Sequence, residues 1–302
     1  MKIKTSAPGK LMLFGEHAVV YDRPCVVTGV SSRIHVEIEK TDGHFMVDAP
    51  GVKDIRFVEE TVRIFKEKFK TGNGLSIKTS SDFSCQYGFG SSSAVTVATI
   101  LALNKLYGTQ LSQKQIFDLG YKITLEVQGV GSGFDIAAAT YGGTTYFVTG
   151  GKVIQPLNVK TISLVVGYSG IKADTPKIVK SLKLKIKSDK TKYNGIFDQI
   201  TKIVEDAKIE LKNSNWRKVG ELMNKNQQLL ESLEVSTEKL DTMCQAALSA
   251  GAYGAKLSGA GGGDCMIAII PEEKRQSIEQ TIKNVAGQII HVTNNAPGVC
   301  LE

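Results

Sequence analysis

Residues 256–265 read KLSGAGGGDC, with four glycines in the five positions from Gly259 to Gly263. The apolar stretch MIAII at 266–270 follows directly. Glycine lets backbone N–H groups approach an anion closely and adopts positive φ without steric cost. The run therefore predicts a phosphate-binding turn that leads into a strand.

Two other glycine-containing elements lie far from this run in the sequence. GFGSSS at 88–93 precedes an apolar helical pattern, and APGK at 7–10 opens a strand-like segment. The first turn of the helix that begins at 91–93 carries no carboxylate, so its N-terminal amides and positive dipole end are available to a phosphate. Serine at 91–93 can also simply cap an ordinary core helix. Taken together, the three elements predict one polyphosphate site assembled by folding, which is typical of a nucleotide-dependent kinase.

Length and composition favour a globular enzyme of two domains. The chain has 302 residues, 42% of them hydrophobic and 22% charged, and contains no apolar run near 18 residues. Its first residues, MKIKTSAPGK, lack the apolar core of a signal peptide. We therefore expect a cytoplasmic protein without a membrane partner. Five widely spaced cysteines without a CxxC pair argue against a disulfide framework or a zinc site.

Most of the formal net charge of +7 lies in one segment. Residues 172–192 hold eight lysines and two aspartates, a net charge of +6. This segment is either a solvated lysine-rich face or a basic flap that attracts acidic substrates and nucleotide phosphates. Because no aromatic residues interleave the lysines, we expect no nucleic-acid partner.

Hydrophobic periodicity predicts strands and helices in both halves of the chain, and hence an α+β architecture. The expected strands are 10–14, 25–30, 34–38, 74–79, 144–148, 162–167, 265–270 and 288–292. Besides the helix that ends at Gly108, the expected helices are 54–70, 112–127, 196–212, 216–233, 237–250 and 273–286.

The sequence also offers a candidate for each group that phosphoryl transfer to an alcohol requires. Lys10, after Pro8 and Gly9, can supply a cation. The amides and side chains of the middle loop can hold the triphosphate, and a serine hydroxyl there can coordinate Mg²⁺; the loop residues concerned are Gly88, Phe89, Gly90, Ser91, Ser92 and Ser93. Asp135, in GVGSGFDIAAATYGG, is a candidate general base, although an aspartate in a glycine-rich loop is often only a turn former.

Three stretches of this chain resemble the sequence motifs of the GHMP kinases. They are APGKLMLFGEHAVVY at 7–21, GFGSSSAVTVA at 88–98 and KLSGAGGGDC at 256–265, in the order found in the family. The resemblance implies ATP and Mg²⁺ as cofactors and a two-lobed fold. The N-terminal lobe would resemble domain 2 of ribosomal protein S5, and the C-terminal lobe would be a ferredoxin-like α/β sandwich. We place these lobes at residues 1–165 and 166–302.

Within the family, GEHAVVY at 15–21 and GAYGAKLSGAGGG at 251–263 resemble mevalonate kinases of the short archaeal type. The resemblance implies that Lys10 and Asp135 form the catalytic pair and that Ser92 binds Mg²⁺. It also implies contacts to the acceptor, mevalonate, from Glu16, His17, Thr175, Gly259 and Ala260. His17 can instead be a structural histidine. A homodimer is left open.

Several positions depart from the mevalonate kinase pattern. Thr124 stands where those enzymes have a Mg²⁺-binding glutamate, and Glu126, two residues further on, can replace it only if the helix ends or bulges there. Gln86 replaces the first glycine of the middle loop, and Asp264 resembles phosphomevalonate kinases instead. Phosphorylation of 5-phosphomevalonate is therefore the alternative activity. A different small alcohol, such as a sugar or homoserine, is the third choice of acceptor. A hypothesis from another class is a nucleotide-binding or regulatory protein with weak catalysis, against which the presence of both Lys10 and Asp135 argues.

Overall fold

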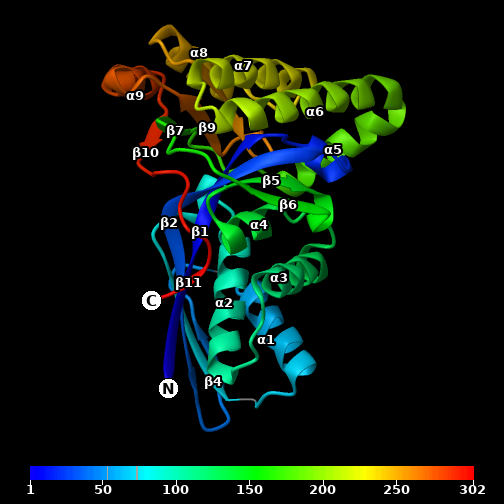
Figure 1. Cartoon of the computed structure of the whole chain (residues 1–302), viewed down its shortest axis with the longest axis vertical. Coiled ribbons are helices and arrows are strands. Elements are labelled where there is room, and N and C mark those ends of the chain that lie inside the picture. The colour runs from blue at the N-terminus through cyan, green and yellow to red at the C-terminus, as the bar shows by residue number, and fades with distance from the viewer. Residues whose placement is uncertain (53, 73) are drawn as a thin grey trace.

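The computed structural model describes residues 1–52, 54–72 and 74–302 and has two lobes (Figure 1). The lower lobe in Figure 1 contains a mixed sheet with helices beside it, and the upper lobe contains a smaller antiparallel sheet covered by helices. This arrangement confirms the predicted two-lobed α+β class.

Two long strands form the centre of the first sheet. Its order is β11-β1-β2-β4-β3, and β5 pairs with β2 and with β6. The strand β2 pairs with β1 along residues 26–39. Its far half also pairs with β4, and its first five residues also pair with β5. The strands are β1 (Lys2–Phe14), β2 (Pro24–Lys40), β3 (Phe45–Asp48), β4 (Leu75–Ser81), β5 (Thr144–Val148), β6 (Val153–Leu157) and β11 (Cys300–Leu301).

Helices cover one face of this sheet because each presents an apolar stripe to it. In α1 (Arg56–Phe69), Val58, Val62 and Phe65 are buried at helical spacing. A capping box between Ser112 and Gln115 starts α3 (Gln113–Gln128). The helix α2 (Ser91–Tyr107) is buried on most sides and packs on β1 and β2. The helix α4 (Phe134–Tyr141) packs against α2 and contacts β1, β2 and β5.

The second sheet has the order β10-β7-β9-β8, with every neighbouring pair antiparallel. Its strands are β7 (Leu164–Tyr168), β8 (Gly254–Ser258), β9 (Cys265–Ile269) and β10 (Gln288–Ile290). The helices above it are α6 (Lys190–Lys212), α7 (Trp216–Ser232), α8 (Glu238–Ser249) and α9 (Arg275–Asn284). Among them, α7 and α8 pack directly on β8.

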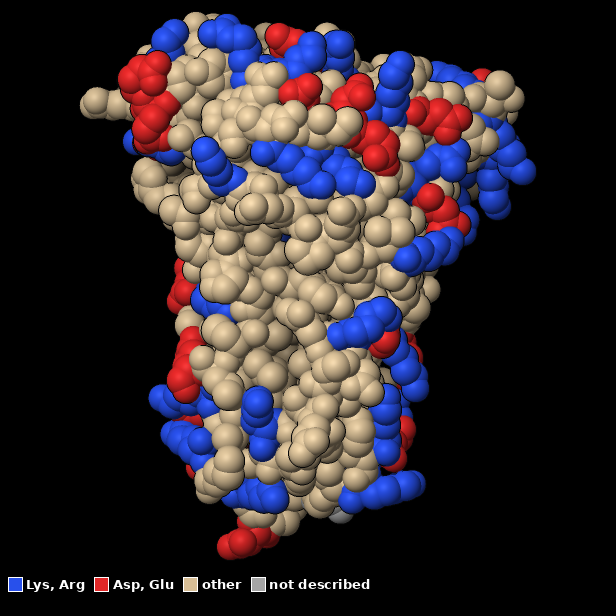
Figure 2. All heavy atoms as spheres, viewed as in Figure 1, with Lys and Arg blue, Asp and Glu red and all other residues tan. Residues whose placement is uncertain are grey.

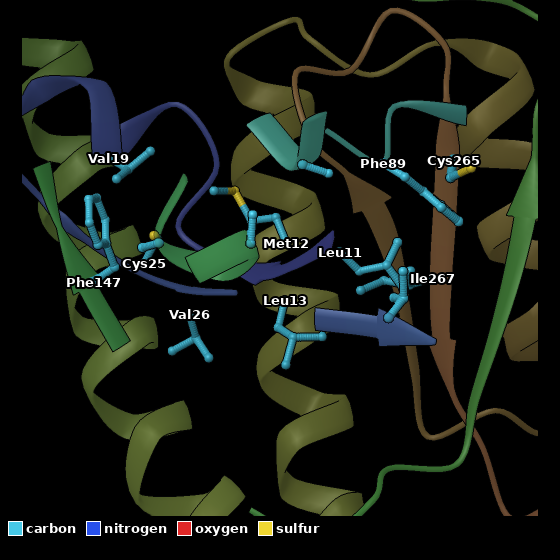
Figure 3. Close-up of a cluster of buried hydrophobic side chains, with 14 of the residues drawn as sticks. Leu11, Met12, Leu13, Val19, Cys25, Val26, Phe89, Phe147, Cys265 and Ile267 are labelled. Carbon is cyan, nitrogen blue, oxygen red and sulfur yellow. The ribbon is translucent and has the colours of Figure 1, made fainter. Parts of the chain in front are cut away.

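The two lobes share one hydrophobic core. The clustered side chains in Figure 3 include Leu11 to Leu13 of β1, Phe89 of the middle loop, and Cys265 and Ile267 of β9, all of them buried. The predicted division at residue 165 falls within β7, and β11 returns to the first sheet beside β1. We therefore place the lobe boundary just before β7 and assign the last strand to the first lobe.

Two sequence predictions about local structure were wrong. Asp135 lies in the first turn of α4 and not in a loop, because Gly133 caps the helix with φ of 93°. No serine side chain caps α2; Gly90, with φ of 74°, precedes it, and the three serines form its first turn. Both helices therefore begin at a glycine with positive φ.

The lysine-rich segment is largely helical. Residues Thr175–Ser188 form α5, which begins at the cap Asp174 and buries only Leu182 fully. Its lysines are exposed except Lys185, which is half-buried and paired with Glu234. Figure 2 shows basic side chains gathered at the end of the upper lobe where α5 and α6 meet. Among the described residues, no helix has the length and apolar character needed to cross a membrane.

Candidate active site

Lys10 lies on β1 at the junction of the three motifs. Its side chain is nearly buried, and its Nζ donates a hydrogen bond to the carbonyl oxygen of Gly88 at 3.0 Å. The same Nζ lies 3.2 Å from Oδ1 of Asp135 and 5.2 Å from the centroid of the Phe134 ring. The first motif thus places a cation between the middle loop and α4.

Asp135 faces Lys10 from the other side. Its side chain is 32% exposed, and its Oδ1 lies 3.2 Å from the ammonium of Lys10. A Cβ built on Gly90 would lie 3.2 Å from Asp135 Oδ1 and 3.3 Å from Lys10 Cε. The pair is therefore packed directly against the start of α2, and any side chain at position 90 would crowd it.

The loop before α2 has the properties of an anion site. Gly88 and Gly90 both adopt positive φ, at 72° and 74°, and the first turn of α2 carries no acidic residue. Ser91 and Ser92 are half-buried, and Ser93 is buried. Unpaired amides and the positive end of the helix dipole favour a phosphate here. The predicted loop residues are thus gathered beside Lys10 and Asp135.

Glu16 and Lys256 form an ion pair in the protein interior. Neither side chain is exposed to solvent, and Lys256 Nζ contacts both Glu16 Oε1 and the carbonyl oxygen of Leu257. Burial raises the pKa of Glu16 and lowers that of Lys256, and their mutual attraction opposes both shifts. The pair joins the segment after β1 in one lobe to β8 in the other.

His17 has an unusual backbone conformation, with φ of 59°. Its Nε2 lies 2.8 Å from the carbonyl oxygen of Ala260, so this nitrogen carries the proton and donates. Burial lowers the pKa of His17, and the bond to Ala260 partly offsets that effect. The imidazole is therefore neutral near pH 7, and it fixes the segment after β1 against the glycine-rich turn.

The glycine-rich turn connects β8 to β9 over the end of β1. Ser258 Oγ accepts a hydrogen bond from the Met12 amide and donates one to the Met12 carbonyl, both at 3.0 Å. Gly259 and Gly261 adopt positive φ, at 110° and 75°. A Cβ on Gly261 would lie 2.0 Å from the carbonyl oxygen of Val235, so glycine is required at that position.

Asp264 ends this turn and contacts the middle loop. Its Oδ1 accepts a hydrogen bond from the amide of Ala173 at 2.9 Å and lies 3.2 Å from Lys172 Nζ. Its Oδ2 would lie only 2.3 Å from a Cβ on Gly88. The residue that departs from the mevalonate kinase pattern therefore neutralises one lysine of the basic segment and requires glycine at 88.

Two predicted residues lie outside this group. Glu126 is ion-paired with Arg63 of α1 and Lys122, because α3 continues without a bulge to Gln128. It is therefore not placed to serve as the predicted metal ligand. Thr175 is exposed as the first residue of α5, three positions before Ile178, whose side chain packs on Gly262.

Sequence reasoning missed Lys256, the partner of Glu16, although it is the first residue of the quoted KLSGAGGGDC run. In a sequence, a single lysine before an apolar residue is typical of a solvated strand end. Only the complete burial of Lys256 in the structure distinguishes it from such a residue. Gly90 was predicted as a phosphate-loop residue, but its role as a spacer for the Lys10 and Asp135 pair was not.

Comparisons with known proteins agree with this geometry. A model described as GHMP kinases N terminal domain matches residues 56–143, and one described as GHMP kinases C terminal matches residues 207–287. A mevalonate kinase of Thermococcus sibiricus is 32% identical, with 100% of this chain and 99% of that protein covered. The crystal structure of L. major mevalonate kinase in complex with R-mevalonate has a TM-score of 0.85 at 27% identity, covering 97% of this chain and 96% of the other.

A phosphomevalonate kinase structure from Streptococcus pneumoniae has the same TM-score, 0.85, over 97% of this chain and 99% of the other. Its identity is 19%, so it shares the fold alone. The chain belongs to the GHMP kinase family. Within that family it is similar over its whole length to the mevalonate kinase of Thermococcus sibiricus.

Proposed function

We propose that this protein transfers the terminal phosphoryl group of ATP to the 5-hydroxyl of (R)-mevalonate. The observation that carries the proposal is the ion pair of Lys10 and Asp135 at the start of α2, beside a loop suited to phosphate. Its full-length similarity to mevalonate kinases supports mevalonate as the acceptor. A small soluble acceptor suits action in the cytoplasm, and a homodimer stays a prediction.

In the proposed mechanism, positioning and electrostatics supply most of the rate enhancement. The amides of residues 88–93 and the N-terminus of α2 hold the phosphates. Lys10 offsets negative charge on the group in transfer, since its ammonium lies at the end of that loop. Asp135 orients the acceptor hydroxyl and accepts its proton, since its carboxylate lies beside Lys10 and its side chain is only partly buried.

The donor set suits a Mg²⁺ ion that is held largely by the nucleotide. Among the residues described, no cluster of three or more acidic, histidine or cysteine side chains could hold a metal. Mg²⁺ commonly combines one or two protein oxygens with substrate phosphates and water. Ser92, at the first turn of α2, would provide a hydroxyl, and the ion would neutralise phosphate charge when bound. Thr124 offers no carboxylate in place of the glutamate; it is buried, and its Oγ1 donates to the carbonyl of Gly120.

The alternative acceptor, 5-phosphomevalonate, carries a second phosphate and would need additional cations. Lys172 is already paired with Asp264 and Lys185 with Glu234, and the other lysines of α5 are exposed to solvent. Lys256 is buried in an ion pair with Glu16, so it offers no unpaired cation to a second phosphate. These contacts favour the unphosphorylated acceptor.

The test is to supply purified protein with Mg-ATP and either mevalonate or 5-phosphomevalonate, and to follow ADP release and product mass. We expect phosphomevalonate to form from mevalonate, with turnover of 5-phosphomevalonate at least 100-fold slower. Product from 5-phosphomevalonate alone would refute the proposed acceptor. Absence of turnover with both acceptors, in protein that still binds ATP, would favour the regulatory alternative.

A further inference from the structure

The ion pair of Glu16 and Lys256 is incomplete on one side. Lys256 Nζ contacts Glu16 Oε1, but Glu16 Oε2 is buried and has no hydrogen-bond partner among the described residues. Leaving a charged oxygen unsatisfied in the interior is costly. An oxygen in this state indicates a place where a ligand donates a hydrogen bond.

Neighbouring contacts hold Glu16 rigidly. On its C-terminal side, His17 contacts the carbonyl oxygen of Ala260 at 2.8 Å. On its N-terminal side, Met12 exchanges two hydrogen bonds with Ser258. A Cβ on Gly15 would lie 2.6 Å from the Cα of Cys25, so the backbone just before Glu16 is packed against β2. These contacts hold the backbone in place on both sides of Glu16.

Glu16 also lies in the same electrostatic environment as the proposed catalytic pair. The positive charge of Lys10 lowers the pKa of Glu16, against the effect of burial. The pKa of Cys25 responds to the charges of Glu16, Asp135 and Lys10 together. A hydroxyl-bearing acceptor placed at Asp135 could extend another hydroxyl toward Glu16. Mevalonate carries a second hydroxyl, at carbon 3, that can donate such a bond.

We propose that Lys256 is a positioning residue for the acceptor: it holds Oε1 of Glu16 in place, so that Oε2 accepts a hydrogen bond from a hydroxyl of the acceptor. The inference rests on the proposed function for the identity of that acceptor. Lys256 itself is occupied by Glu16 and by the Leu257 carbonyl, so it acts through Glu16 and not on the substrate. The other role open to it is a structural strut between the lobes.

A double-mutant cycle separates these two roles. The variants are Lys256→Met, Glu16→Gln and the double variant, with the exposed Lys177→Met on α5 as the control. We expect Lys256→Met to raise KM for mevalonate about 10- to 100-fold, the range for a lost hydrogen bond to a charged group, and KM for ATP less than about threefold. In the Glu16→Gln background the same change should alter KM for mevalonate less than about threefold. Lys177→Met should leave both constants unchanged.

Three results would overturn the proposal. One is that Lys256→Met raises KM for ATP as much as KM for mevalonate, which indicates a structural strut. Another is that Lys256→Met raises KM for mevalonate by the same factor in the Glu16→Gln background, which indicates that Lys256 contacts the substrate directly. The third is an unchanged KM for mevalonate. Wild-type turnover of mevalonate is measured first, so failure of the proposed function is recognised separately.

The double variant keeps the test decisive if a single variant does not fold. Removing both buried charges leaves no unpaired ion, and such replacements are often neutral for stability. We expect the folded double variant to bind an ATP analogue as the wild type does, and mevalonate 10- to 100-fold more weakly. Wild-type affinity for mevalonate in this variant would refute the role of Glu16 and Lys256 together.

Discussion

Replacement of Asp135 by Asn tests the proposed base with little change in shape. The amide retains an oxygen that can accept from Lys10 Nζ, now 3.2 Å from Asp135 Oδ1, but it cannot accept a proton from the acceptor hydroxyl. General-base assistance contributes about 10²- to 10⁴-fold, so kcat should fall by that factor, or about 2.7–5.5 kcal/mol on the barrier. KM for ATP should change less than about threefold, because backbone amides and the α2 N-terminus hold the phosphates.

The expected effect on stability is small. The Asp135 side chain is 32% exposed whereas that of Lys10 is 8% exposed, so the pair lies between a surface and a buried ion pair. We expect a loss of no more than about 2 kcal/mol in the free energy of unfolding. Urea unfolding of wild type and variant measures this term separately from kcat.

The assay is steady-state ADP release at saturating Mg-ATP and mevalonate, with nucleotide binding measured by titration. Asp118→Asn is the matched control, since Asp118 is an exposed aspartate paired with Lys114 on α3. Its kcat should equal that of wild type. A folded Asp135→Asn variant that retains kcat within about threefold of wild type would refute the assignment of Asp135.

Three other predictions concern residues around the site. Burial lowers the pKa of His17 below the 6.5 of the unfolded chain, so at low pH the unfolded state binds a proton that the folded state does not. The free energy of unfolding should therefore fall as pH decreases below 6.5, by up to about 1.4 kcal/mol per pH unit. Urea unfolding between pH 5 and 8 should show that His17→Gln removes this pH dependence. Gly88→Ala should weaken ATP binding more than tenfold in a titration, because the new Cβ would lie 2.3 Å from Asp264 Oδ2. Adding Asp264→Gly to this variant should recover part of the lost affinity. The remaining loss, about 1 kcal/mol, is the cost of positive φ at an alanine. Glu126→Gln should leave the Mg²⁺ concentration for half-maximal activity within twofold of wild type, because this carboxylate is paired with Arg63; a tenfold increase would restore Glu126 as a metal ligand.

Periodicity predicted most of the regular elements because apolar spacing reflects which face is buried. The predicted helix 54–70 corresponds to α1, and the predicted strand 265–270 corresponds to β9. The short elements α4 and β8 were missed because glycine-rich flanks and small residues leave no clear period. The helix α5 was missed because its lysines outnumber its buried residues, and the cap Asp174 was not recognised as its start.

The arrangement of the site was less accessible from the sequence. Lys10 and Asp135 are 125 positions apart in the chain, and the separation of Glu16 from Lys256 is 240. The motif resemblance named Lys10, Asp135, Glu16 and His17 as site residues, but it did not indicate that Lys256 is buried. Glu126 pairs with Arg63 because α3 continues unbroken to Gln128. The spacing between Glu126 and Asp135 in the sequence could not reveal this contact.

The chemical groups of the site follow from residue types along the chain: glycines that permit positive φ, a helix start free of acidic residues, and one lysine and one aspartate in fitting contexts. These are local properties, fixed by residue type and by neighbours a few positions away. The tertiary structure decided which charges meet, since burial and pairing depend on segments that the chain brings together only on folding. That is why Lys256 became an interior partner for Glu16, Lys172 was neutralised by Asp264, and Glu126 was directed to Arg63.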